Sequence, residues 1–430
     1  MKKLLSALAL CSVLTASVVM TGCGEHEHTF EEAWTYDATY HWHKATCEHT
    51  DEKSDYAEHV YTNDYDVDCN TCGAVRLALV DLWDGTTAEV PTAVNGVISI
   101  TTAEQLAGVA KKVNEGTTYA GVTIKLEANI DLNNKAWTPI GTSHRKTTEN
   151  VKKFSGVFDG NYKHIFGLTN VGYVPADTRE ETAEFDIYNY GLFGYTENAE
   201  IKNLTVTANI NCDAETLKGD SVAAIVGYAN KGLNMQNCVV NGTINGGFDA
   251  AAGLVGRSYN ATATEKLIIE NCTNNATITS DFKSAGILGY VASNTYFKIN
   301  NCVNTGSIKA TGAMTDATHY SAYTSGIVNY SWNRTTEHTI IVIHNTNSGN
   351  IYNMDAKNNE SGITNINSYA YIANTSAFNF TQAVTPHYDF TGNTNTGKVY
   401  VAGEEESTVL VSATSQLQPT PEFNCEKNID

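Results

Sequence analysis

The chain has 430 residues, of which 42% are hydrophobic, and its formal net charge is −20 at pH 7. This acidic balance argues against nucleic acid as a partner, because nucleic-acid binding depends on Lys and Arg neutralising phosphates. The hydrophobic content and the 33 glycines indicate a folded chain with a large core and many tight turns, and they exclude a disordered one.

Residues 1–22 have the pattern of an export signal. Lys2 and Lys3 precede an apolar stretch over 4–19, and small residues precede Cys23. A secretory signal peptide has this order of regions, whereas polar residues interrupt the stretch too often for a transmembrane anchor. The segment MTGC, which ends at Cys23, resembles a bacterial lipobox. The resemblance implies that Cys23 becomes a lipidated N-terminus, with plain secretion as the alternative.

Residues 23–76 form a small module rich in His, Cys and aromatic residues. Cys69 and Cys72 have the C-x-x-C spacing at which two thiolates bind one zinc ion, and Gly73 permits the turn that follows. A module of roughly fifty residues buries little core, so a metal would stabilise it. Since abundant thiolates favour closed sites, we expect structural zinc. The predicted ligands are Cys47, Cys69, Cys72 and either His59 or His49.

Other interpretations of this module stay open. His41 and His43 also offer imidazoles, Cys69 and Cys72 could instead form a disulfide, and the histidines could simply lie on the surface. The segments HWHKATCEHTDE and CNTCG resemble a small His/Cys domain that often stands next to the lipobox in clostridial-type surface proteins.

A connector over 77–95 leads to a helix predicted at 101–115. Its apolar residues recur at helical spacing, Thr102 and Gln105 fit a capping box, and Gly116 ends the pattern. An open sheet end invites pairing with other chains. We therefore expect this helix to cover the first coil of the domain that follows.

From residue 121 the chain becomes a series of similar strands. Apolar tetrads begin at residues 191, 224, 253, 286 and 326, by subtraction 33, 29, 33 and 40 residues apart, and all but the one at Ala224 begin with glycine. The segments MQNCVVNGTI, IENCTNNATI and INNCVNTGSI follow three of them. Self-similarity at such a period indicates a solenoid. Strands without intervening helices must pair with their equivalents in the next unit, which predicts a parallel β-helix over 96–402 with coils about 4.8 Å apart.

Equivalent residues of this β-helix are expected to stack. Cys238, Cys272 and Cys302 would form an interior column of small apolar side chains, because a coil spacing of about 4.8 Å exceeds the roughly 3.8 Å between the Cβ atoms of a disulfide. Residues 403–430 are expected to be a flexible tail. A ladder of amides would close the turns at Asn203, Asn237, Asn271, Asn301 and Asn345.

Tyrosines follow the tetrads, with Arg257 at the same place in the third unit. Stacked aromatic rings could bind sugars by face contact, or they could merely cover the sheet edge. The candidate ligand-binding residues are Tyr195, Tyr228, Tyr290 and Tyr330.

The repeats resemble the GLUG-repeat family. The motif stands as GLFGYTENAEIKNLTV at 191–206 and less perfectly at 227–240, and an entry segment resembling that of the family stands at 156–168. The resemblance implies a right-handed parallel β-helix on exported, adhesin-like bacterial surface proteins, and it implies no conserved catalytic set.

The sequence therefore favours a lipid-anchored protein of the bacterial cell envelope, outside the cytoplasm, that binds a glycan or a host or cell-surface protein and is not an enzyme. It favours no oligomeric state. The alternatives are a carbohydrate-active β-helix enzyme, a polysaccharide lyase or glycoside hydrolase, and a structural envelope spacer. An enzyme would need acid and base groups gathered on one sheet face, and no charged column recurs at the coil spacing. Its candidates would be Asp159, His164, Asp213 and Asp220.

Overall fold

The protein is described here from a computed structural model. It divides into two compact units, Met1–Val80 and Asp81–Asp430. The structure describes residues 27–37, 39–61, 69–74, 83–144, 147–171, 173, 188–212, 219–246, 249–292, 294–311, 323–331, 339–353, 368–370, 373–376, 387–401, 404–406 and 411–414.

The first unit contains an antiparallel sheet of three strands in the order β1-β2-β3. The strands are β1 (Phe30–Tyr36), β2 (Tyr40–Ala45) and β3 (Lys53–Glu58). Among the described residues of this unit, only His41, Ala45, Cys69 and Ala74 are buried. So small a core contributes little hydrophobic stabilisation, which is the situation in which small domains use a metal or a disulfide.

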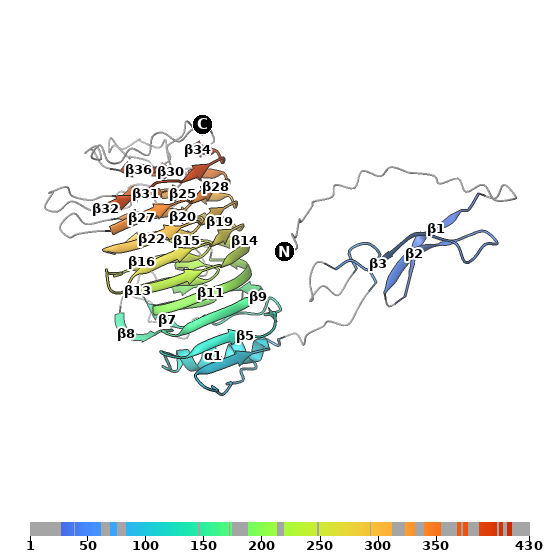
Figure 1. Cartoon of the computed structure of the whole chain (residues 1–430), viewed down its shortest axis with the longest axis horizontal. Coiled ribbons are helices and arrows are strands. Elements are labelled where there is room, and N and C mark those ends of the chain that lie inside the picture. The colour runs from blue at the N-terminus through green and yellow to red at the C-terminus, as the bar shows by residue number, and fades with distance from the viewer. Residues whose placement is uncertain are drawn as a thin grey trace, which may run out of the picture. The chain divides into compact units, whose positions relative to one another are not determined.

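The second unit is a parallel β-helix, as predicted, and Figure 1 shows its strands stacked in coils along one axis. It begins with β4 (Val97–Ile100), α1 (Ala103–Asn114), β5 (Thr123–Leu126), β6 (Ile130–Asp131), β7 (Thr142–His144), β8 (Thr147–Lys152) and β9 (Val157–Thr169). One row of stacked strands consists of β10 (Tyr188–Tyr190), β12 (Gly219–Ala223), β15 (Ala250–Ala252), β20 (Lys283–Ala285), β25 (Tyr323–Ser325) and β30 (Ser368–Ala370).

The remaining strands form the rest of each coil. Apart from β35, they pair in parallel with equivalent strands of a neighbouring coil, as β13 does with β16 and β17 with β22. They are β11 (Phe193–Asn211), β13 (Val226–Gln236), β14 (Val239–Asn245), β16 (Val255–Tyr259), β17 (Leu267–Glu270), β18 (Thr273–Asn274), β19 (Thr277–Ser280), β21 (Leu288–Ala292), β22 (Tyr296–Asn300), β23 (Val303–Asn304), β24 (Ile308–Ala310), β26 (Val328–Ser331), β27 (Thr339–Ile343), β28 (Thr346–Asn347), β29 (Ile351–Asn353), β31 (Ala373–Ser376), β32 (His387–Asp389), β33 (Thr394–Asn395), β34 (Val399–Val401), β35 (Glu404–Glu406) and β36 (Val411–Thr414).

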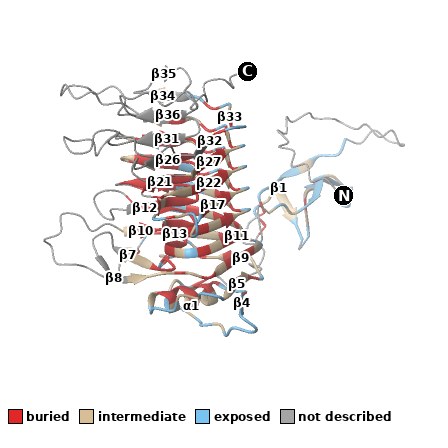
Figure 2. Ribbon diagram, turned by 60° about the vertical axis from the view of Figure 1, so that its left-hand side comes forward, coloured by how far each residue is buried: buried red, intermediate tan, exposed pale blue. Residues whose placement is uncertain are grey.

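The core runs through the middle of the coils, and Figure 2 shows many residues of the stacked strands buried. Cys238, Cys272 and Cys302 are each 0% exposed and have free thiols. Ile244 and Ile278 pair in register as one of several apolar columns. The predicted Cys column is confirmed as packing of small side chains, and its burial raises the pKa of the Cys272 and Cys302 thiols well above the ordinary value.

Helix α1 lies at the N-terminal end of the stack, as expected (Figure 1). It buries Leu106, Val109 and Val113 in the same core as the first strands. The Thr102 hydroxyl accepts a hydrogen bond from the Gln105 backbone N–H at 3.3 Å, which caps the helix. The Gln105 side chain accepts from the backbone N–H of the preceding Thr101 instead of from Thr102, so the capping box is formed with a shift of one residue.

The two ends of the β-helix extend further than the sequence suggested. Trp83, in the predicted connector, is 3% exposed and packs edge-on to Trp137 with ring centroids 5.8 Å apart. At the other end, β35 pairs antiparallel with β34 and β36 pairs in parallel with β31. The predicted tail from 403 therefore begins among paired strands, because the last coil satisfies its backbone groups in this way; residues 415–430 lie outside the described part.

The amide ladder at the turns needs a correction in its last member. Asn301 has a positive φ of 53°, and His344, with φ 55°, takes its place in the next coil because Val303 pairs with Thr346. Asn345 therefore occupies the position of Cys302, and its side-chain oxygen accepts from the Cys302 backbone N–H at 2.9 Å. Asn and His both adopt the left-handed region more readily than most residues, so the exchange at the turn is tolerated.

Candidate metal centre and aromatic column of the β-helix

His41 lies at the centre of the first unit. Strand β2 is the middle strand, and His41 pairs with Tyr36 of β1 and with Ala57 of β3. His41 is 2% exposed, and the Trp34 ring stands edge-on to its imidazole with ring centroids 4.8 Å apart. Both neighbouring strands and an aromatic ring therefore fix the direction of this side chain.

Cys69 and Cys72 lie in a tight turn that presents both sulfurs to one side. The Gly73 N–H donates to the Cys69 carbonyl at 2.9 Å, and the Cys69 N–H donates to the Ala74 carbonyl at 3.0 Å. Gly73 has a φ of 70°, which a glycine adopts without strain. The Ala74 N–H points at the Cys72 sulfur at 3.4 Å. This is the turn that the C-x-x-C-G spacing predicts.

Four ligand atoms converge here, from His41, His59, Cys69 and Cys72, all within 4.8 Å of one another. The Cys69 sulfur is 3.9 Å from His41 Nδ1, and the Cys72 sulfur is 3.4 Å from His59 Nδ1. In tetrahedral zinc, bonds of about 2.3 Å to sulfur and about 2.05 Å to nitrogen place two such ligand atoms about 3.6 Å apart. The donor set and its spacing therefore fit a closed Cys₂His₂ zinc site.

His59 is held by a second contact. Its Nε2 lies 2.9 Å from the Asp37 carbonyl, so that Nε2 carries the proton and Nδ1 faces Cys72. Metal-binding histidines generally donate their other ring N–H in this way, which fixes the tautomer and the orientation. The hydrogen bond to Asp37 is the main reason that the pKa of His59 is raised.

The Cys69 thiol is disposed to lose its proton. Burial acts to raise its pKa, but backbone hydrogen bonds with Cys72, Thr71 and Val60, together with the His59 side chain, lower the pKa of Cys69 to about 6. Burial raises the pKa of Cys72. Since thiolates are the form that binds zinc, the site offers one ligand in nearly the required state.

The structure groups the predicted ligands differently from the predicted Cys₃His set. It brings Cys69 and Cys72 together with His59 and adds His41, whereas Cys47 and His49 belong to a second group with His28. The physical reason is the β1–β2 register, which the sequence spacing does not reveal. The alternation of side chains along β2 does not single out His41, because it places His43 on the same side of the strand. Both Cys69 and Cys72 are free thiols rather than a disulfide.

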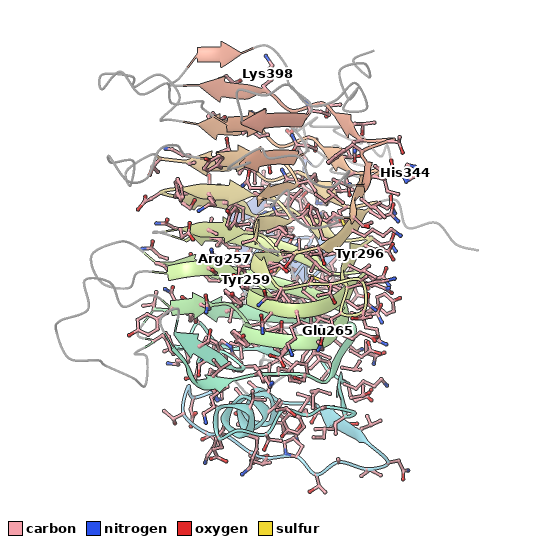
Figure 3. All side chains as sticks on the ribbon, turned by 90° about the vertical axis from the view of Figure 1, so that its left-hand side faces the viewer. Arg257, Tyr259, Glu265, Tyr296, His344 and Lys398 are labelled. Carbon is pink, nitrogen blue, oxygen red and sulfur yellow. The ribbon has the colours of Figure 1, made fainter. Side chains whose placement is uncertain are left out.

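Aromatic residues follow one flank of the β-helix. Tyr195, Tyr228, Arg257 and Tyr290 pair in register through successive coils. The rings of Tyr195 and Tyr228 stack with centroids 5.3 Å apart and planes 6° apart, and the Arg257 guanidinium carbon lies 5.3 Å from the centroid of the Tyr290 ring. Tyr330 pairs with Val291 across an irregularity instead of continuing this column, and its side chain lies outside the described residues. Figure 3 shows Arg257 on the face of the β-helix turned toward the viewer.

A charged group lies beside this column. The Asp249 carboxylate pairs with Arg257 at 3.0 Å and with Lys283. Lys283 Nζ also lies 4.5 Å from the centroid of the Tyr290 ring. The two cations flank the Asp249 carboxylate, which is the one carboxylate of this group among the described side chains, and the arrangement holds the aromatic column in place.

Two acid–base candidates of the enzyme alternative, Asp159 and His164, make hydrogen bonds within the β-helix. Asp159 accepts from the Asn161 N–H at 2.9 Å and from the Asn203 side chain at 3.1 Å. His164 stacks on Phe166, with Nε2 2.8 Å from the Thr207 hydroxyl, and burial lowers its pKa to about 4. Asp213 and the side chain of Asp220 lie outside the described residues.

Comparisons with known proteins give a fold likeness only. No protein-family model matches the chain, and no curated protein matches it. The crystal structure of a "putative immunoglobulin A1 protease" from Bacteroides ovatus is similar at a TM-score of 0.49 and 17% sequence identity, over 76% of this chain and 87% of that chain. A likeness at this level concerns the path of the chain and carries no assignment of activity. The resemblance to the GLUG-repeat family therefore remains an expectation.

The described residues include no helix that is both long enough and apolar enough to cross a membrane.

Proposed function

We propose that this chain is an adhesin-type binding module of the bacterial cell envelope, lipid-anchored outside the cytoplasm through Cys23. Its β-helix would present one flank to a glycan, or to a protein of a host or cell surface. The signal-peptide pattern and the lipobox resemblance support the location. The aromatic column on the β-helix supports the binding role.

The observation that carries the proposal is the regular spacing of this column. Tyr195 and Tyr228 have nearly parallel rings on adjacent coils, and Tyr290 follows two coils after Tyr228 with Arg257 between them. Tyr195 is 8% exposed, whereas Tyr228 and Tyr290 are half-buried. Because the rings of Tyr195 and Tyr228 stack on each other, the column presents ring edges and hydroxyls, repeated at the coil spacing of about 4.8 Å, to an extended chain of sugars. Such a row suits a long ligand better than it suits a single small molecule in a pocket.

The charges described on the β-helix also favour binding over hydrolysis. Glu197 pairs with Lys153 at 2.6 Å, and Glu270 pairs with Lys298 at 2.7 Å. A glycosidase needs two carboxylates on either side of the bond that it cleaves. Carboxylates paired with lysines of neighbouring coils are instead typical of a neutralised surface.

In the first unit, a structural metal ion would supply the stability that the small core does not. We propose that His41, His59, Cys69 and Cys72 bind structural zinc, since four protein donors leave no open position for a substrate. The metal would hold together a unit whose described core consists of four buried residues.

A glycan array with the purified protein tests the proposal. The wild type is expected to bind a defined group of glycans, and Tyr228→Ala and Tyr290→Ala are each expected to weaken this binding by tenfold or more. Tyr162→Ala is the matched control, because Tyr162 is 77% exposed and lies outside the column. Binding to no glycan and to no surface protein, or equal binding by all three variants, would refute the proposal. Cleavage of an arrayed glycan would favour the enzyme alternative.

A further inference from the structure

We infer that His28, Cys47 and His49 form a second metal site, which takes up an exchangeable Zn²⁺ ion and leaves one coordination position open. The three ligand atoms lie within 4.8 Å of one another. This site is distinct from the Cys₂His₂ site in its ligands, its exposure and its number of donors.

The sheet register brings the first two ligands together. Phe30 pairs with Ala45 across β1 and β2, and the next residues outward continue the pairing, since the Thr46 N–H donates to the Thr29 carbonyl at 2.7 Å. One step further along the same antiparallel ladder, His28 stands opposite Cys47. Residues directly opposite each other in such a ladder have Cβ atoms about 4.5–5.5 Å apart. The side chains meet accordingly, with His28 Nδ1 3.4 Å from the Cys47 sulfur.

The third ligand comes from the turn after Cys47. The Glu52 N–H donates to the His49 carbonyl at 3.1 Å, which closes the chain into a turn before β3. The turn places the His49 ring edge-on to the His28 ring, with centroids 5.1 Å apart. The 3.4 Å between nitrogen and sulfur is close to the roughly 3.6 Å that separates two ligands of tetrahedral zinc.

The donors indicate which ion the site would take. One thiolate and two imidazoles are the donor types that bind zinc in proteins, and they disfavour Mg²⁺ and Ca²⁺, which prefer oxygen. Glu48, Asp51 and Glu52 stand beside the ligands in the sequence. Their negative charge raises the local concentration of cations.

The exposure of the site indicates how it would hold the ion. His28 and His49 are exposed and Cys47 is half-buried, whereas His41 and Cys69 of the first site are buried. Three protein ligands leave the fourth position of a tetrahedral ion to water or to a donor from another molecule. The second ion therefore exchanges more readily than the first.

Zinc counting by native mass spectrometry of the purified protein tests the inference. The wild type is expected to bind two zinc ions, one of which a mild chelator removes. The double variant H28A/H49A should bind one ion that resists the chelator, and H41A should lose the resistant ion. The matched control H43Q removes a histidine of the same strand outside both groups, and it should keep both ions. Far-UV circular dichroism checks that H28A/H49A and H43Q retain the wild-type fold.

Cobalt substitution provides an independent measurement. With both sites filled, three thiolates contribute to the cobalt–thiolate charge-transfer band, and C47S should remove the share of one of them, about one third. The inference is overturned if the wild type binds a single zinc ion that H41A abolishes, or if H28A/H49A still binds two. It is also overturned if C47S leaves the cobalt band unchanged. A wild type that keeps only the readily removed ion would refute the structural zinc of the proposed function while supporting this second site.

Discussion

At the scale of single residues, His164 shows how burial sets a protonation state. Its ring stacks on Phe166, and its Nε2 contacts the Thr207 hydroxyl of the next coil. Desolvation disfavours the charged imidazolium, which is why the pKa of His164 falls to about 4 from an ordinary value of 6.5. The folded protein therefore holds this histidine neutral at a pH where the unfolded chain would protonate it.

The predicted consequence is a loss of stability in acid. In the unfolded state His164 binds a proton below its ordinary pKa of 6.5, whereas in the folded state it binds the proton only below about pH 4. The free energy of unfolding therefore falls as the pH drops through this window. Allowing for partial exposure, the contribution of His164 is about 1–2 kcal/mol. Urea unfolding of wild type and His164→Gln at pH 7.5 and pH 4.5 measures it. The wild type should lose more stability between the two pH values than the variant; an equal loss would contradict the prediction.

The metal ligands show which residues the sequence could and could not provide. The sequence alone predicted Cys69 and Cys72 as a pair of ligands, because a C-x-x-C-G segment forms its turn from local contacts alone. The histidine ligands could not be predicted in this way, since they depend on which strands pair and in which register. His41 meets Cys69 across 28 residues, and Cys47 turns toward His28 instead. No spacing rule distinguishes these pairings before the sheet is known.

At the scale of the structural element, the tetrad glycines mark places where neighbouring coils approach too closely for a side chain. A Cβ atom on Gly256 would lie 2.6 Å from the Val222 nitrogen and 2.7 Å from the Gly227 carbonyl oxygen. Both are backbone atoms of the preceding coil, so they cannot move aside as a flexible side chain would. The glycines thus allow the apolar tetrads to stack.

We predict that Gly256→Ala destabilises the β-helix by about 1–3 kcal/mol, as overpacking of a tight interior does. Denaturant unfolding followed by circular dichroism should show a lower midpoint with an unchanged slope. Lys309→Ala, an exposed position on β24, serves as the control and should remain within about 0.5 kcal/mol of wild type. A midpoint for Gly256→Ala equal to that of the control would show that the coils separate at little cost.

Repetition explains why elements were predicted better than their junctions. Identical residues at one place in each unit must stack, which is how the Cys column and the parallel pairing could be inferred. The longer spacing between the last tetrads in the sequence hid the register there, so that Asn345 was assigned to the turn position that His344 occupies. A ladder of amides that runs through the buried Asn274, Asn304 and Asn347 to the half-buried Asn395 was also missed. In this ladder each side-chain nitrogen donates to the next side-chain oxygen at 2.7 Å. Buried amides in register satisfy each other, so the polar sequence did not indicate an interior column.

At the scale of the whole molecule, two units with different sources of stability share one chain. The β-helix has a continuous apolar core that extends from Trp83 to Phe390. In the first unit, four residues are buried among those described, and two of them, His41 and Cys69, are candidate zinc ligands. Hydrophobic burial therefore stabilises the β-helix, whereas metal binding would stabilise the smaller unit.

Removal of the metal should consequently unfold one unit and spare the other. With a strong chelator present, the sheet that carries Trp34 and Trp42 is expected to lose its structure, which tryptophan fluorescence would report. The thermal transition of the β-helix should stay within a few degrees of its original temperature, because its core contains none of the four ligands. Added zinc should restore the first transition, and H41A should lack it from the start. Two unchanged transitions in the chelator would mean that the small unit folds without a metal, and a joint shift of both would mean that the units unfold together.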